Sequence, residues 1–218
     1  MRRSPSIFRL AVLALALVSF AAPFPSFTSA ESASDLSADE RRKLRAGEIV
    51  VRPKNETRGR LELIGGTSYL VIDASPEEVW RAVRDAPNFH KMLPQAHTTD
   101  VLARSEEHAR VRLSHAYGPM ATTYVLDLRF LNETRVMMFR LNERYVSGME
   151  AGWGFIRIGD YSRGRTLVSF GAMVDIGQRL GTNLIKGQIH EWLLKVPLTM
   201  KWHIEGEGRT AYRADSAP

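Results

Sequence analysis

The chain has 218 residues, of which 44% are hydrophobic and 25% are charged, and its formal net charge is +6. This composition is typical of a globular protein with room for one domain and additional segments. The absence of cysteine excludes disulfides, thiolate metal sites, a cysteine nucleophile and a lipid-modified cysteine.

Residues 1–30 have the features of a secretory signal peptide. Three arginines precede an apolar run at residues 10–22, and small residues at 28–30 offer a cleavage site. The run is short for a membrane span, although an uncleaved N-terminal anchor is the alternative. We therefore expect an exported protein located in the periplasm. Removal of residues 1–30 would leave 27 basic and 24 acidic residues, which is a formal net charge of +3. So small an excess gives no argument for nucleic-acid binding, and we expect no nucleic-acid partner.

Residues 31–60 are expected to form a polar lead-in to the main domain. A short charged helix is predicted there, with Ser37 as its N-cap and Gly47 at its end. Residues 48–52 are predicted to form a strand and residues 53–60 a loop.

The most informative stretch of the chain runs from Val71 to Pro94. A strand predicted at residues 67–74 leads into it. Ser75, Pro76 and Glu78 then supply an N-cap oxygen, a proline at the first helical position and a glutamate three residues after the cap. This pattern predicts the start of a helix directly after the strand.

The predicted helix buries one apolar stripe. Val79, Trp80 and Val83 lie on that stripe, and the helix is expected to end before Pro87. A second short helical turn is predicted at residues 88–93, where the next proline ends it.

Further along, four segments alternate apolar residues with other residues at a period of two. They lie at residues 111–117, 124–130, 137–141 and 168–174. Such alternation indicates an antiparallel sheet with one buried face. Another strand is predicted at residues 153–158, although the pattern leaves its inward face open.

The pattern becomes helical near the C-terminus. From Asn183 onward apolar residues recur at spacings of three and four, as on an amphipathic helix. Pro197 is expected to end or kink this helix, and residues 198–204 either continue it or are extended. The main domain is then predicted to span residues 61–205, with a flexible tail at residues 206–218.

This order of elements resembles the helix-grip fold of the START-like superfamily, which includes polyketide cyclases and coenzyme-Q-binding proteins. The most specific part of the resemblance is Asp73-Ala74-Ser75-Pro76-Glu77-Glu78-Val79-Trp80, followed by Pro87-Asn88-Phe89 and Leu93-Pro94. The resemblance implies an α+β fold. In it, a curved antiparallel sheet of about seven strands wraps around a long C-terminal helix, and two short helices follow the first strand.

The resemblance also implies a cavity between the sheet and the long helix. Such a cavity binds a hydrophobic small molecule, for example a lipid, an isoprenoid or a polyketide-like compound. The side chains expected to face it are the candidate ligand-binding residues Leu113, His115, Tyr117, Tyr124, Leu126, Phe139, Phe170, Ile185, Ile189 and Leu193. The alternative is that these side chains fill a dry core.

Two of the candidate residues are polar, His115 and Tyr117. A buried imidazole or phenol needs a hydrogen-bond partner, which a ligand or another protein group can supply. These two residues are therefore the candidates for orienting the ligand, although an internal hydrogen bond would satisfy them as readily.

The sequence predicts no cofactor, no metal site and no catalytic residue. The six histidines show no metal-binding spacing, and there is no nucleophile elbow, phosphate-binding loop or dinucleotide fingerprint. A ligand-binding protein is therefore favoured. Two alternatives stay open: a cyclase, aromatase or hydrolase that uses the same cavity, and a partner-binding protein whose cavity has collapsed.

Four arginines are expected on the outer face of the sheet: Arg110, Arg112, Arg129 and Arg140. A basic patch of this kind favours transient contact with anionic lipid headgroups. Because Asp127 interrupts the patch, a solvated sheet face is the interpretation we favour.

Overall fold

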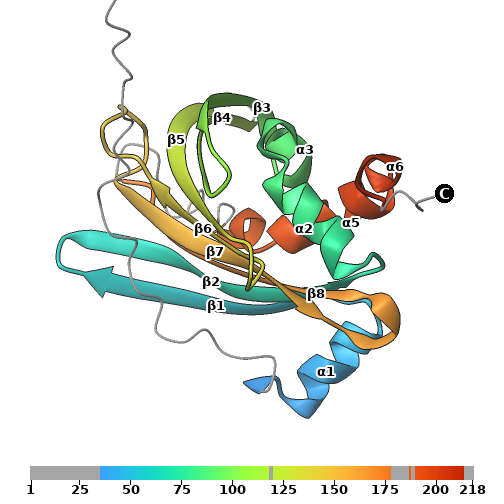
Figure 1. The fold of residues 1–218 in the computed structure, drawn as a ribbon. Coiled ribbons are helices and arrows are strands. Elements are labelled where there is room, and N and C mark those ends of the chain that lie inside the picture. Colours follow the sequence, from blue (N-terminus) through green and yellow to red (C-terminus); the bar gives the residue numbers. More distant parts are fainter. Residues whose placement is uncertain (1–34, 118–119, 178–186, 188–189, 214–218) are drawn as a thin grey trace, which may run out of the picture.

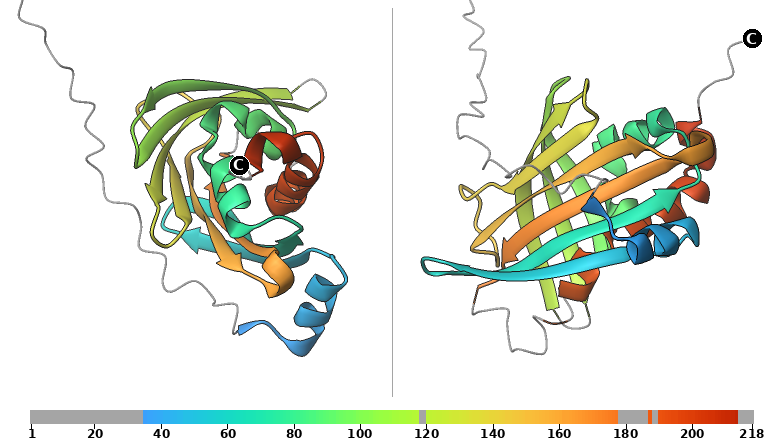
Figure 2. Two further views of the ribbon diagram at one scale, coloured as in Figure 1. Left: turned by 45° about the vertical axis from the view of Figure 1, so that its right-hand side comes forward. Right: turned by 90° about the horizontal axis from the view of Figure 1, so that it is seen from below.

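The structure, a computed structural model, describes residues 35–117, 120–177, 187 and 190–213. These residues form one antiparallel sheet of eight strands in the order β1-β2-β8-β7-β6-β5-β4-β3. The sheet curves around α2, α3 and α5, while α1 lies on its outer side (Figures 1 and 2). The α+β class and the curved antiparallel sheet are therefore as predicted.

The bounds of the elements follow the chain. The strands are β1 (Val50–Arg58), β2 (Leu61–Ile72), β3 (Ala96–Arg104), β4 (His108–Tyr117), β5 (Met120–Leu131), β6 (Val136–Leu141), β7 (Ala151–Asp160) and β8 (Thr166–Asp175). The helices are α1 (Ala38–Arg45), α2 (Pro76–Arg84), η2 (Ala86–Asn88), α3 (Phe89–Met92), η3 (Ser162–Gly164), α5 (Val196–Glu205) and α6 (Arg209–Tyr212).

The sheet has eight strands rather than about seven, because β3 was not predicted. This strand lies at one edge of the sheet, and most of its residues are exposed. Its pairing with β4 shifts register between Ala96 and Thr98 and again between Val101 and Ala103. An exposed, bulged edge strand needs no alternation of apolar residues, so its sequence looks like that of a loop.

The prediction of a loop at residues 53–60 is wrong. Strand β1 continues to Arg58 and pairs with β2 along its whole length, and the turn is confined to Gly59 and Arg60. Backbone hydrogen bonds hold this edge strand while most of its side chains after Val50 stay exposed, so burial leaves no pattern in residues 53–58.

The predicted helix α1 is present, and its N-cap is Ser37 as expected. It covers the outer face of the sheet at the β1–β2–β8 end. Leu36, Leu44, Val50, Tyr69, Val71 and Leu167 form a small second core there. Residues from the lead-in are thus packed on the sheet, while the predicted domain boundaries stay a prediction.

The predicted start of α2 is confirmed. The Ser75 hydroxyl oxygen accepts a hydrogen bond from the Glu78 backbone N–H at 3.3 Å, and the Glu78 carboxylate accepts one from the Ser75 N–H at 2.8 Å. The predicted apolar stripe is buried, and the ring of Trp80 meets that of Phe130 edge to face. This cap places the helix directly against the concave face of the sheet.

The predicted long C-terminal helix is interrupted. Residues 190–193 are helical, Leu194 and Lys195 form a turn, and α5 begins at Val196. Pro197 therefore lies in the first turn of a new helix, where its missing N–H costs no hydrogen bond. Residues 198–204 continue as helix, one of the two expected outcomes.

Part of the tail expected to be loose is folded. Helix α6 lies at residues 209–212, and the side chain of Tyr212 is buried. The Tyr212 hydroxyl donates a hydrogen bond to the Asp85 carboxylate at 2.8 Å, and the nearby Asn88 amide donates to the same oxygen. These contacts hold the C-terminal end against the end of α2.

Two consecutive glycines in the middle of β2 allow a close approach of neighbouring backbones. A Cβ atom at Gly66 (φ 135°) would lie 2.1 Å from the Arg52 carbonyl oxygen, and one at Gly65 would lie 1.9 Å from the Ala172 carbonyl oxygen. The Gly65 carbonyl oxygen accepts a hydrogen bond from His190 Nε2 at 2.5 Å. This point of the sheet therefore anchors the C-terminal helical segment.

We predict that Gly66→Ala lowers the free energy of unfolding by more than about 2 kcal/mol, since the added methyl group meets backbone atoms that cannot move independently. Gly59→Ala is the matched control. It also has a positive φ, 61°, but a Cβ atom there meets nothing within 4 Å, so the cost should stay near 1 kcal/mol. Urea unfolding of both variants measures the difference, and equal losses would contradict the steric argument.

Candidate functional site

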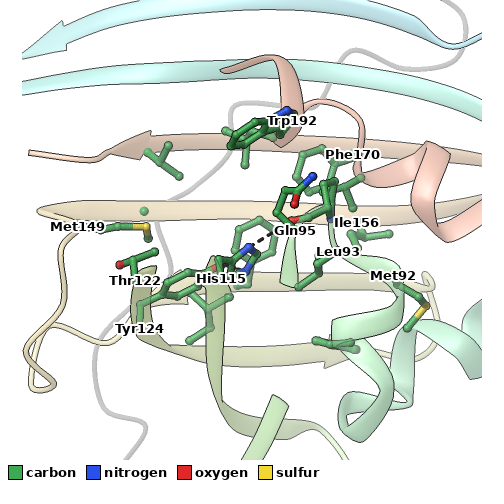
Figure 3. Close-up of a pocket in the computed structure, with 18 of the residues that line it drawn as sticks. Met92, Leu93, Gln95, His115, Thr122, Tyr124, Met149, Ile156, Phe170 and Trp192 are labelled. Atoms are coloured by element: carbon green, nitrogen blue, oxygen red, sulfur yellow. Dashed lines mark hydrogen bonds between the residues drawn. The ribbon is translucent and has the colours of Figure 1, made fainter. Parts of the chain in front are cut away.

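A cavity of about 220 Å³ lies between the concave face of the sheet and the helical segments that cover it. The sheet contributes Tyr124, Leu126, Phe139, Ile156, Phe170 and Val174, and the helical segments contribute Phe89, Met92, Trp192, Leu193, Val196 and Met200. Figure 3 shows several of these side chains around the space. The lining is almost wholly apolar.

Small residues on β7 help to leave this space open. Gly152 lines the cavity, and a Cβ atom there would have neighbours only at 3.4 Å or more. The ring of Phe139 lies over Gly154 and stacks against Phe170, with the two ring centroids 6.1 Å apart. The wall is therefore a pair of aromatic rings beside a bare stretch of backbone.

The structure brings together six of the predicted site residues. His115, Tyr124, Leu126, Phe139, Phe170 and Leu193 all line the cavity. Whether they contact a ligand stays a prediction.

The other four candidates do not join that group in the described residues. Leu113 is fully buried and packs in the solid part of the core instead of lining the cavity. The side chain of Tyr117, and residues Ile185 and Ile189, lie outside the part of the chain that the structure describes.

Several lining residues were not named from the sequence. Thr122 could have been found, because it is two residues before Tyr124 on the same strand face. Trp192 lies beside Leu193 on the predicted apolar stripe. By contrast, Gln95 and Met149 come from connections, where no periodic pattern indicates which side chains turn inward.

The polar part of the cavity wall is built around His115. Its Nδ1 lies 3.2 Å from the Pro94 carbonyl oxygen, and its Nε2 lies 2.8 Å from the Tyr124 hydroxyl oxygen. A carbonyl oxygen can only accept, so Nδ1 carries the proton. In the neutral ring Nε2 then accepts, and the Tyr124 hydroxyl donates to it.

Both partners of this hydrogen bond are neutral near pH 7. Burial lowers the pKa of His115 to about 4, against the opposing effect of its hydrogen bond to Pro94, and the nearby His97 lowers it further. Burial raises the pKa of the Tyr124 hydroxyl. The pair therefore presents hydrogen-bonding groups without charge.

Two further polar residues adjoin this pair. Thr122 is paired directly with His115 across the two strands, and its hydroxyl oxygen is buried without a hydrogen-bond partner among the described residues. Gln95 is exposed at the cavity opening with a left-handed backbone (φ 59°), and its carbonyl oxygen accepts from the Ala116 N–H. Figure 3 shows both residues near His115.

No protein-family model and no curated protein matches the sequence. Solved structures match the fold. The Zhui aromatase/cyclase from Streptomyces sp. R1128 has a TM-score of 0.58 at 14% identity, over 72% of this chain and 99% of that chain. A START superfamily protein from Mycobacterium smegmatis has a TM-score of 0.53 at 15% identity, over 66% and 97% of the two chains. The chain has a START-like fold.

A third structure supports the same assignment. The STAR-related lipid transfer protein from Xanthomonas axonopodis has a TM-score of 0.50 at 10% identity, over 71% of this chain and 99% of that chain. The predicted resemblance to START-like and polyketide cyclase proteins is thus confirmed for the fold. At such low identity the comparison speaks for the fold alone.

Two other features of this START-like domain bear on its chemistry. Within the described ranges, no three His, Asp or Glu side chains lie close enough together to hold a metal ion. The expectation that the protein uses no metal or cofactor stays a prediction. No helix in the same ranges is long and apolar enough to cross a membrane.

We predict that His115 makes stability depend on pH between its usual pKa, about 6.5, and its pKa in the folded protein, about 4. In this window the unfolded chain binds a proton that the folded protein does not. The free energy of unfolding therefore falls as the pH is lowered from 6.5 to 4, by up to about 3 kcal/mol from this residue.

Urea unfolding of the wild type and of His115→Gln across this pH range isolates the effect. All other groups are shared by the two proteins, so the difference between their curves reports His115. The variant should show the flatter curve, and parallel curves would mean that His115 titrates normally.

Proposed function

We propose that this protein binds a hydrophobic small molecule in the cavity between the sheet and the C-terminal helical segments. The observation that carries the proposal is a cavity of about 220 Å³ with an almost wholly apolar lining. Burial of the ligand's apolar body supplies the binding free energy, roughly 25 cal/mol for each Å² removed from water. The fold supports this role, since similar structures include an aromatase/cyclase and a lipid transfer protein.

The size of the cavity limits the ligand. A dry cavity of about 150 Å³ is known to hold benzene, and pockets for drug-sized ligands measure about 300–1,000 Å³. At about 220 Å³, this cavity suits a compound of one or two rings, or a short isoprenoid, better than a phospholipid with two acyl chains.

The groups in the cavity support binding more than acid–base catalysis. A general acid or base works best when its pKa is near the working pH. The pKa of His115 is about 4, that of Tyr124 is raised, and the His115 Nδ1 proton is already donated to Pro94. Turnover by a cyclase, aromatase or hydrolase mechanism thus has less support than ligand binding.

The cavity of about 220 Å³ between sheet and helical segments supports ligand binding over the alternative of a partner-binding protein whose cavity has collapsed.

We also propose that the protein is exported to the periplasm. The support is the sequence of residues 1–30, which lie outside the described residues.

Contact with a membrane surface and the absence of a nucleic-acid partner stay predictions. Of the four outer arginines, Arg110 and Arg140 face the buried Asp127 at 2.7 and 3.9 Å, which supports a structural role for these two.

We predict that Gly152→Leu weakens the binding of naphthalene at least tenfold. The new side chain has room at its Cβ but then occupies the cavity. Gly159→Leu is the matched control on the same strand, because Gly159 does not line the cavity and has only one atom within 4 Å of its Cβ position. Fluorescence titration with naphthalene measures both affinities.

The control variant should bind like the wild type. Equal weakening in both variants, or a wild type that does not bind naphthalene, would count against the cavity as the binding site. Native mass spectrometry of protein purified from its own cell envelope then tests for a co-purified hydrophobic compound.

A further inference from the structure

We propose that the ligand is an alcohol or a phenol whose hydroxyl group binds at Thr122 and Tyr124. This inference rests on the proposed function, because it assigns the chemistry of the molecule that the cavity binds.

The cavity has one polar region inside an otherwise apolar wall. In the β4–β5 pairing, His115 lies opposite Thr122 and Leu113 lies opposite Tyr124. Thr122 and Tyr124 are two residues apart and so share one face of β5, the face that lines the cavity. A ligand that fills this space is therefore apolar over most of its surface and polar at one end.

The hydrogen bond between Tyr124 and His115 determines what Tyr124 can offer to a ligand. The Pro94 carbonyl oxygen holds the proton on His115 Nδ1, so the Tyr124 hydroxyl must donate to Nε2. The proton of the Tyr124 hydroxyl is then engaged in the hydrogen bond to His115 Nε2. Only the lone pairs of the hydroxyl oxygen remain available to a ligand. Tyr124 can therefore accept a hydrogen bond from a ligand but cannot donate one.

Thr122 supplies the complementary group. Its hydroxyl oxygen is buried and has no partner among the described residues, an arrangement that destabilises the fold until a partner is supplied. Since Thr122 lines the cavity, rotation about its Cα–Cβ bond to another staggered rotamer turns the hydroxyl toward the cavity. A ligand oxygen at this end then receives a hydrogen bond from Thr122.

A hydroxyl group satisfies both residues, because it donates to Tyr124 and accepts from Thr122. A ketone, a quinone or an ether only accepts, and leaves its lone pairs facing those of the Tyr124 oxygen. An amine or a carboxylic acid is charged at neutral pH, and no charged side chain lines the cavity among the described residues to pair with it. The neutral hydroxyl is the group that fits.

Isothermal titration calorimetry with three probes that share the naphthalene ring system tests this assignment. Naphthalene has no polar group, 2-naphthol has a hydroxyl, and 2-methoxynaphthalene has an oxygen that only accepts. We expect 2-naphthol to bind about three- to tenfold more tightly than naphthalene, the gain of roughly one net hydrogen bond. The methoxy compound should bind more weakly than 2-naphthol.

Two neighbouring substitutions locate the effect. Thr122→Val removes the hydroxyl that donates to the ligand oxygen in this assignment and should remove most of the preference for 2-naphthol. Thr123→Val is the matched control, since the Thr123 hydroxyl bonds to that of Ser114 at 3.0 Å on the outer face of the sheet. This variant should keep the preference.

The outcomes separate the two proposals. If naphthalene binds but 2-naphthol and the methoxy compound bind no differently from it, the hydroxyl assignment is wrong and the proposed function stands. The same holds if Thr122→Val keeps the full preference. If none of the three probes binds, the proposed function itself is overturned. The comparison on the unmodified protein decides the assignment even where Thr122→Val fails to fold.

Discussion

The apolar concave face of a single curved sheet has to be buried, and in the part of the chain that the structure describes only helical segments pack against it. The rest of this structure depends on that constraint. Strands β4 to β8 all turn apolar residues to this face, where α2, α3 and α5 contribute the opposing side chains. Within the described residues, no second sheet packs against this face (Figure 2). Where the side chains of the helical segments do not fill the volume enclosed by the concave face, a cavity remains inside the domain.

The space stays open because of what lies on each side of it. Gly152 leaves bare backbone on the sheet, while the opposite side is covered by the short segment that carries Trp192 and Leu193. That segment is held at one end by the contact between His190 and Gly65, and at the other by the turn before α5. Helix α5 is in turn fixed to α3, since the Thr199 hydroxyl donates to the Met92 carbonyl oxygen at 2.6 Å.

The chemistry of the cavity comes from the point where α3 ends. Pro94 follows this helix and supplies a carbonyl oxygen that no helical N–H uses, and His115 donates to it. One backbone acceptor therefore sets the protonated nitrogen of a histidine, the direction of a tyrosine hydrogen bond and the kind of group that the wall offers a ligand. Burial then keeps the pair neutral, since a charge there would lose its hydration.

Local sequence patterns predicted the α+β class and the curved antiparallel sheet. The capping box at Ser75, the period-two strands and the apolar stripe near the C-terminus each depend on residues close together in the chain, and their order identified the START-like fold. Other features differ from the prediction: β3 is an additional strand, β1 is longer than expected, and the C-terminal helix is interrupted before α5. Most residues of the two edge strands are held by backbone hydrogen bonds and stay exposed, so no burial pattern marks them.

For the site, the sequence by itself determined the inward faces of β4, β5, β6 and β8, and with them five of the residues that line the cavity. The apolar stripe of the C-terminal helical segment added a sixth, Leu193. Only the tertiary structure decided that Leu113 packs solidly while its neighbour His115 borders the cavity, and that Gln95 and Met149 reach it from connections. It also decided the partner of His115, 21 residues away in the chain. Periodicity reports the face on which a side chain lies, whereas a cavity and a hydrogen-bond direction depend on groups that meet only when distant segments pack together.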